Sequence, residues 1–254
     1  MIRSSQTDVS LAQVHVSPLS SSEALAHLDA LSIDGGHHYV CFCESNLFVH
    51  AHNKPQVAAA VRGAALVLPD GISLTLAARL LAGRLIERVP GPSFLPAACE
   101  HGIDKGWRHY FLGGAQGVAE RLAGALSARF PGLQVVGTHS PPFRPMTLEE
   151  DQSLVREIER ARPHFLWVGL GAPKQELWMA EHVGKIDVPV MLGVGAAFDF
   201  HSGSAPWAPK WIRDAGIEWA YRAVTGGRRV FFRNVRCVSK AAMIIAREAW
   251  RQRL

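Results

Sequence analysis

Two acidic residues stand directly after apolar runs that have the composition of buried strands. Glu44 follows residues 39–43, and Asp70 follows residues 65–68. In an open parallel sheet, ligands bind where loops leave the carboxyl ends of the strands, so we expect both acids at a ligand site. A carboxylate there can act as a general base. In isolation, the Pro-Asp-Gly setting of Asp70 would instead favour a helix cap.

Two glycine-containing turns follow later apolar runs and lead into predicted helices. Glycines let the backbone approach a ligand closely, and a helix N-terminus favours a phosphate. The first turn contains Gly113, Gly114 and Gly117. The second turn places three polar residues at a helix start: Lys174, Gln175 and Glu176. Glutamate suits the helix dipole there but lysine does not, so a bound phosphate would account for the lysine.

Three further residues complete the set of candidates: Asn46, Arg88 and Asp199. Alone, Arg88 or Asp199 would more often form a structural ion pair. The 4 cysteines include no C-x-x-C pair, and the 12 histidines show no ligand spacing. No Walker lysine loop, nucleophile elbow or Asp-x-Asp pair occurs. The sequence thus predicts no metal site and no cofactor, and lysines and arginines must offset any phosphate charge.

The elements that position these residues alternate along the chain. Short apolar runs predict strands at 39–43, 65–68, 109–112, 133–138, 164–168 and 188–194. Helical segments are expected near 22–31, 54–62, 72–82, 93–105, 116–130, 148–161 and 173–182. Strands that alternate with helices of this length favour an α/β fold, a Rossmann-like parallel sheet with helices on both faces.

The composition sets limits on the class of protein. With 254 residues and 48% hydrophobic side chains, the chain fits one large domain or one domain with an appendage. It lacks a run long enough for a membrane span and an apolar export signal near the start, and its cysteines suit a reducing compartment. These features favour a cytoplasmic location.

Basic residues are concentrated at the C-terminus. Residues 207–254 hold 11 Lys/Arg and 3 Asp/Glu, whereas residues 1–206 hold 16 and 19. On one helical projection, seven cations share a sector: Arg222, Arg229, Arg233, Arg236, Lys240, Arg247 and Arg251. Gly226–Gly227 is expected to break that helix. A solvated face is the simpler interpretation, but a basic amphipathic helix also suits an anionic membrane surface. We therefore divide the chain into an N-terminal extension (1–36), a catalytic core (37–206) and a basic helical appendage (207–254).

Six segments taken together resemble the WecG/TagA/CpsF family of bacterial glycosyltransferases. They are AALVLPDG (64–71), ERVPG (87–91), YFLGGAQG (110–117), LWVGLGAPKQE (166–176), GVGAAFDF (193–200), and APKW with GIEWAYR (208–211 and 216–222). The resemblance implies inverting transfer of a sugar from a UDP-sugar to a polyprenyl-diphosphate-linked acceptor, for surface polysaccharide or glycolipid synthesis. It also implies peripheral binding at the inner face of the cell membrane, without a metal, and a habit of homo-oligomer assembly through the core.

The resemblance also assigns roles to individual residues. Asp70 matches the general base, and Arg88 matches an arginine that meets the diphosphate or the sugar. The appendage arginines that reach the acceptor or the leaving diphosphate map to Arg222, Arg229 and Arg233. The chain departs from the family pattern where threonine is replaced by Glu44, which can share the base role, and where a basic residue is replaced by Trp207.

Two other functions stay open at this point. One is a nucleotide-sugar-binding or scaffold protein that has lost turnover, which would explain Glu44. The other is a nucleic-acid-binding protein, but the basic tail lacks the interleaved aromatics and zinc spacing of that class, so we expect no nucleic-acid partner. The donor sugar, which can be of glucose, mannose, N-acetylmannosamine or uronate type, is not determined by the sequence, and neither is the acceptor glycan.

Overall fold

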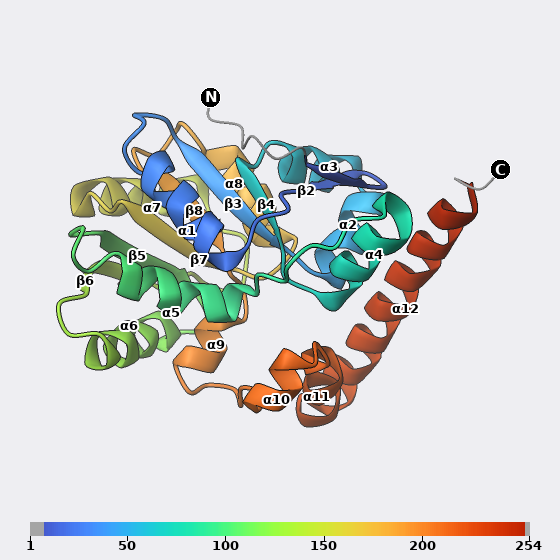
Figure 1. Cartoon of the computed structure of the whole chain (residues 1–254). Helices are drawn as coiled ribbons and strands as arrows, with labels where there is room; N and C mark the ends of the chain where they lie inside the picture. Colours follow the sequence, from blue (N-terminus) through green and yellow to red (C-terminus); the bar gives the residue numbers. More distant parts are fainter. Residues whose placement is uncertain (1–7, 252–254) are drawn as a thin grey trace.

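A six-stranded parallel sheet forms the centre of the molecule (Figure 1). The computed structural model describes residues 8–251, except the side chains of Arg229 and Arg233. The strands pair in the order β4-β3-β8-β7-β5-β6. Their bounds are β3 (His38–Cys43), β4 (Leu66–Pro69), β5 (Arg108–Gly113), β6 (Gln134–His139), β7 (Phe165–Gly169) and β8 (Val190–Gly193). Because all the pairings are parallel, every carboxyl end lies at the same edge of the sheet.

Helices cover both faces of this sheet, and the alternation within each strand explains how. In β3, Tyr39, Cys41 and Cys43 enter one hydrophobic core, whereas Val40 and Phe42 enter the other. The second core is closed by α1 (Ser21–Leu31), α5 (Gly91–His101), α6 (Val118–Arg129) and α9 (Ala197–His201). The first is closed by α2 (Ser45–Asn53), α3 (Pro55–Arg62), α4 (Ile72–Ala82), α7 (Leu148–Ala161), α8 (Lys174–His182) and α12 (Gly227–Arg251).

The predicted α/β fold with a parallel, doubly covered sheet is confirmed. Each of the six expected strands is present, and the expected bounds of α4 and α7 are the observed ones. Helix α2, which begins at Ser45 immediately after Glu44, was not predicted. The segment SNLFVHAHN is short and rich in Asn and His, so its sequence carries only a weak helical pattern. The Glu44 cap that starts the helix is visible only in the structure.

The N-terminal segment packs against the core. Strands β1 (Val9–Leu11) and β2 (Val14–Val16) form an antiparallel hairpin whose four valine and leucine side chains are buried in the first core. Helix α1 begins with a capping box, in which Ser20 and Glu23 satisfy each other's backbone N–H groups. The described part of the predicted extension therefore contributes to the folded domain.

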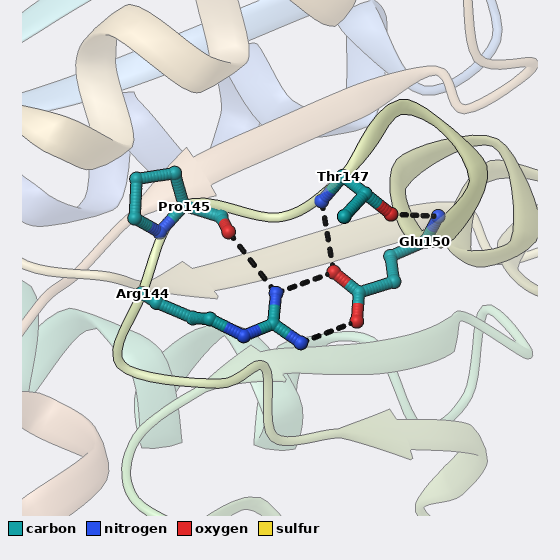
Figure 2. Close-up of polar contacts among 4 residues, drawn as sticks. All are labelled: Arg144, Pro145, Thr147 and Glu150. Atoms are coloured by element: carbon teal, nitrogen blue, oxygen red, sulfur yellow. Dashed lines mark hydrogen bonds and ion pairs between the residues drawn. The ribbon is translucent and has the colours of Figure 1, made fainter.

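The start of α7 shows how one helix of this fold is anchored. Thr147 and Glu150 form a second capping box, with contacts of 2.8 and 3.2 Å. The Arg144 guanidinium donates to both oxygens of Glu150, at 2.7 and 2.6 Å, and to the Pro145 carbonyl (Figure 2). The arginine therefore ties the preceding loop to the helix N-terminus.

Three helices form the C-terminal appendage: α10 (Lys210–Asp214), α11 (Glu218–Thr225) and α12. Helix α11 ends at Thr225 with Gly226 as its C-cap, and α12 begins at Gly227, whose φ is +76°, so the expected break is confirmed. Helix α12 runs along α2 and α4 (Figure 1) and buries Ala241, Ile244 and Ile245 against them. Phe231 and Ala242, on the same helix, are exposed.

The break also changes the predicted row of cations. Arg222 lies on α11 and is partly buried, so it does not continue the basic sector of α12. The remaining described members of the sector are exposed on α12: Arg236, Lys240, Arg247 and Arg251. Within residues 8–251, no helix has the length and apolar character needed to cross a membrane.

Candidate active site

Asp70 follows β4 at the carboxyl edge of the sheet, but it does not cap the next helix. The N-cap of α4 is Gly71, with no side-chain hydrogen bond. Instead, the Asp70 carboxylate accepts a hydrogen bond of 3.3 Å from the backbone N–H of Gly91. Burial, and then the carboxylates of Glu44 and Glu218, raises the pKa of Asp70 to about 7, although the Gly91 hydrogen bond and Arg88 oppose the shift. A carboxyl that titrates near neutrality is suited to general base catalysis.

Glu44 is the residue that caps a helix. Its two carboxylate oxygens accept hydrogen bonds from the backbone N–H groups of Asn46, at 2.7 Å, and Leu47, at 3.1 Å. Both N–H groups belong to the first turn of α2, which would otherwise leave them unpaired. The cap interpretation that the sequence offered for Asp70 thus applies to Glu44.

A third carboxyl, that of Glu176, lies deeper in the same region. It is fully buried at the start of α8, and burial raises its pKa to about 7. Its Oε1 accepts a 2.8 Å hydrogen bond from Gln175, while no partner among the described residues reaches its Oε2. Burial and then the carboxylates of Glu44, Glu176 and Asp70 raise the pKa of the Cys43 thiol, which places the three acids around the end of β3.

Gln175 and Asn46 hold the loops of the site in place. The Gln175 side chain accepts from the Gly171 N–H at 3.1 Å and donates to the Gly193 carbonyl at 2.8 Å, which ties the end of β7 to the end of β8. Asn46 donates to the Ala172 carbonyl at 3.2 Å. The described contacts of both residues are therefore structural, and Gln175 is buried.

The glycine turn after β5 has a steric cause that is visible in the structure. A Cβ on Gly113, whose φ is +141°, would lie 2.5 Å from the backbone carbonyl carbon of Gly169. The ends of β5 and β7 therefore approach each other closely, with no side chain between Gly113 and Gly169. Gly114 and Gly117 also adopt positive φ angles, +73° and +77°, and Gly117 is the N-cap of α6 without a side-chain hydrogen bond. The backbone N–H groups of the α6 start remain suited to an anion.

Arg88 connects the core to the appendage. One of its terminal nitrogens donates a 2.5 Å hydrogen bond to the backbone carbonyl of Arg213 on α10. Burial raises the pKa values of Asp70 and Glu218, and the positive charge of Arg88 opposes both shifts. The arginine therefore lies between the acid that follows β4 and the helices that close over the sheet edge.

Helix α11 adds two charged residues to the site. Arg222 lowers the pKa values of Asp199, on α9, and of Glu218, although burial is the larger influence and raises both. Glu218 and Arg222 are four residues apart on one helix, so they share a face. Glu218 was not among the residues predicted from the sequence, although this spacing is visible there.

The structure therefore brings most of the predicted residues to one edge of the sheet. Lys174 is also there, exposed at the first position of α8. The side chains of Arg229 and Arg233 lie outside the part of the chain that the structure describes. Among residues 8–251, no group of three or more His, Cys, Asp or Glu side chains is arranged to hold a metal ion.

Comparison with known proteins places this site in context. The profile of the glycosyl transferase WecG/TagA/CpsF family matches residues 9–254. Two relatives from Staphylococcus aureus, of strains MRSA252 and NCTC 8325 / PS 47, are 29% and 28% identical over 170 residues. Both are named N-acetylglucosaminyldiphosphoundecaprenol N-acetyl-beta-D-mannosaminyltransferase. The similarity covers 67% of this chain and 65% of each relative. Because the family profile covers almost the whole chain, the protein belongs to the WecG/TagA/CpsF family of glycosyl transferases.

Proposed function

We propose that the protein is an inverting glycosyltransferase that moves a sugar from a UDP-sugar to a polyprenyl-diphosphate-linked acceptor. The observation that carries this proposal is Asp70, a carboxyl with a pKa of about 7 at the carboxyl edge of a parallel sheet, with Arg88 nearby. The names of the two relatives support a lipid-diphosphate acceptor and make an N-acetylmannosamine donor the first to test.

In the proposed step, Asp70 takes the proton from the acceptor hydroxyl while that oxygen attacks the anomeric carbon. The bond between the anomeric carbon and the diphosphate oxygen breaks at the same time, and UDP leaves with the bonding electron pair. General base catalysis of this kind is typically worth 10²–10⁴-fold. The Gly91 N–H bond fixes the carboxylate, so its other oxygen can face the acceptor.

The charge that develops on UDP requires cations. Arg88 acts electrostatically on Asp70 and Glu218, Arg222 acts on Asp199 and Glu218, and Lys174 stands at the start of α8. Well-placed groups that stabilise a developing oxyanion contribute roughly 3–4 kcal/mol each. In this proposal the protein itself supplies that charge, without a metal or cofactor.

The test is UDP release from a panel of UDP-sugars with a lipid-diphosphate acceptor in detergent. Asp70→Asn is compared with Asp104→Asn, an exposed aspartate outside the site. We expect acceptor-dependent release with one donor, lost by 10²–10⁴-fold in the first variant and retained in the second. Full activity of Asp70→Asn would refute the assignment of the base, and UDP binding without release would favour a binding protein.

We also propose that α12 binds the inner face of the cytoplasmic membrane. Phe232, Met243 and Trp250 are spaced by 11 and 7 residues, close to whole helical turns, and 60%, 51% and 69% of their surfaces are exposed. The exposed cations Arg236 and Lys240 flank this line. Exposed apolar residues beside cations suit an anionic bilayer surface.

Flotation with anionic and neutral vesicles tests this docking. Removal of α12 would expose the core residues it covers, so point substitutions are the better perturbation. Arg236→Glu with Lys240→Glu is expected to abolish flotation with anionic vesicles. Arg156→Glu with Arg160→Glu, exposed on α7, is the control of equal charge. Equal flotation of both double variants would contradict the proposal.

A further inference from the structure

Two aromatic rings near the site lie almost parallel, and each carries an arginine. The rings of Phe200, on α9, and Trp207 have centroids 6.2 Å apart and an interplanar angle of 9°. The Arg213 guanidinium carbon lies 3.8 Å from the Trp207 ring centroid. The Arg222 guanidinium carbon lies 5.4 Å from that of Phe200. The stack therefore presents two cations from two different helices, α10 and α11.

Two N–H groups in this stack are buried without an acceptor. They are Nε of Arg213 and Nε1 of Trp207, and no described residue lies within hydrogen-bond distance of either. Buried donors are rarely left unpaired, since their desolvation is then uncompensated. Stacking occupies only the face of a guanidinium and leaves its N–H edge available. The arrangement is suited to an incoming group that is rich in acceptor oxygens.

The stack lies next to the reaction centre. The backbone carbonyl of Arg213 accepts the hydrogen bond from Arg88, and the charge of the Arg213 side chain opposes the burial that raises the pKa of Glu218. Glu218 in turn raises the pKa of Asp70. Arg213 is thus linked to Asp70 in two ways, through Arg88 at its backbone carbonyl and through Glu218 at its side chain. The Arg213 side chain makes no ion pair within the described residues.

We propose that Arg213, held in place by Trp207, is a further diphosphate-binding residue of this enzyme. The inference rests on the proposed function, because a diphosphate occurs in both of the substrates assigned there. It can belong to the donor nucleotide or to the lipid-linked acceptor. In either case Arg213 contributes a planar, permanently charged donor to the phosphate oxygens, and Trp207 acts as its positioning residue.

If the stack only held α10 against α9, substitutions of Trp207 would affect stability and affinity differently. Trp207→Phe keeps an aromatic face for the guanidinium, whereas Trp207→Leu keeps bulk but removes the π system. A purely structural role predicts that both variants change thermal stability and leave ligand affinity alone. A positioning role predicts that the leucine variant loses part of the diphosphate affinity and that the phenylalanine variant retains more of it than the leucine variant.

The experiment measures the affinity of the full-length protein for UDP and for inorganic pyrophosphate by calorimetry. Its variants are Arg213→Ala, Arg213→Lys and the two Trp207 substitutions, and Arg156→Ala on the exposed face of α7 is the matched control. Melting temperatures establish that each variant is folded. The KM for the lipid-linked acceptor is then measured with the same proteins.

We expect Arg213→Ala to weaken binding by about 10- to 100-fold, the range of a charge-assisted hydrogen bond, with Arg156→Ala unchanged. Trp207→Leu should weaken it by about 3- to 5-fold. If Arg213→Ala binds UDP more weakly in the absence of lipid, Arg213 binds the diphosphate of the donor. If its UDP affinity is unchanged and its KM for the acceptor is higher, Arg213 binds the diphosphate of the lipid.

Arg213→Ala with the affinity and acceptor KM of the wild type would overturn the inference and leave the proposed transfer intact. A wild-type protein that bound neither UDP nor pyrophosphate would overturn it as well. If instead no sugar were transferred but pyrophosphate binding still depended on Arg213, the reaction assignment would fail while the anion site stood.

Discussion

Asp70 should destabilise the protein at neutral pH, because the fold holds its carboxyl where ionisation is unfavourable. Its pKa rises from an ordinary value of 3.8 to about 7. A pKa change of this size corresponds to about 4 kcal/mol at full ionisation. Since the residue is partly exposed, solvent screening reduces the effect, and we expect about 2 kcal/mol in practice.

The dependence on pH follows from linkage. Well below pH 3.8, Asp70 is protonated in both the folded and the unfolded chain, so the group has no effect on stability. As the pH rises toward 7, the unfolded chain ionises while the folded protein retains the proton, and the free energy of unfolding falls. Above pH 7 the whole cost is present. Asp70→Asn removes the ionisable group and should therefore be more stable than the wild type, increasingly so between pH 4 and 7.

Thermal unfolding of both proteins from pH 4.5 to 8.5 measures this difference. About 2 kcal/mol corresponds to a rise in Tm of roughly 4–8 °C in a domain of this size. The amide oxygen of the substituted side chain can still accept the Gly91 hydrogen bond, and Asp104→Asn controls for the loss of an exposed charge. A difference in Tm that did not vary with pH, or a less stable Asp70→Asn at pH 8, would refute the reasoning.

Three further predictions concern other parts of the site. Glu44→Ala should lose the cap of α2 and about 1 kcal/mol of stability, whereas Glu44→Gln should retain most of both stability and turnover. A folded Glu44→Gln without turnover would return the base role to Glu44. Gly113→Ala should reduce soluble yield and Tm because its methyl group meets Gly169, while Gly124→Ala, in open space on α6, should raise stability by about 0.5–1 kcal/mol. EDTA should leave turnover intact, and loss that magnesium restores would contradict the metal-independent proposal.

The fold was largely predictable because its signals are local. Buried parallel strands appear as short runs rich in branched and aromatic residues, and the helices between them carry their own periodicity. Helix α2 was missed because its start depends on the side chain of Glu44, which a strand-to-loop boundary does not reveal. The appendage break was predicted from two adjacent glycines, but the loss of Arg222 from the cationic row appeared only with the helix directions.

The candidate residues were predictable as a set, because strand ends in a parallel sheet converge on one edge and the polar residues that follow them converge with them. Their individual roles were not. Glu44 and Asp70 occupy equivalent positions after neighbouring strands, yet one meets the free N–H groups of a helix start and the other meets a single N–H from Gly91, far along the chain.

The sequence by itself determined the layered α/β architecture, the family resemblance and the location of a polar, glycine-lined sheet edge, since each depends on residue types and short spacings. Tertiary structure alone decided which acids, Asp70 and Glu176, have their pKa raised to about 7 by burial, and it alone placed Arg213 on Trp207 beside Arg88. The physical reason is that desolvation, stacking and hydrogen bonding depend on distances between segments far apart in the chain, which no local pattern records.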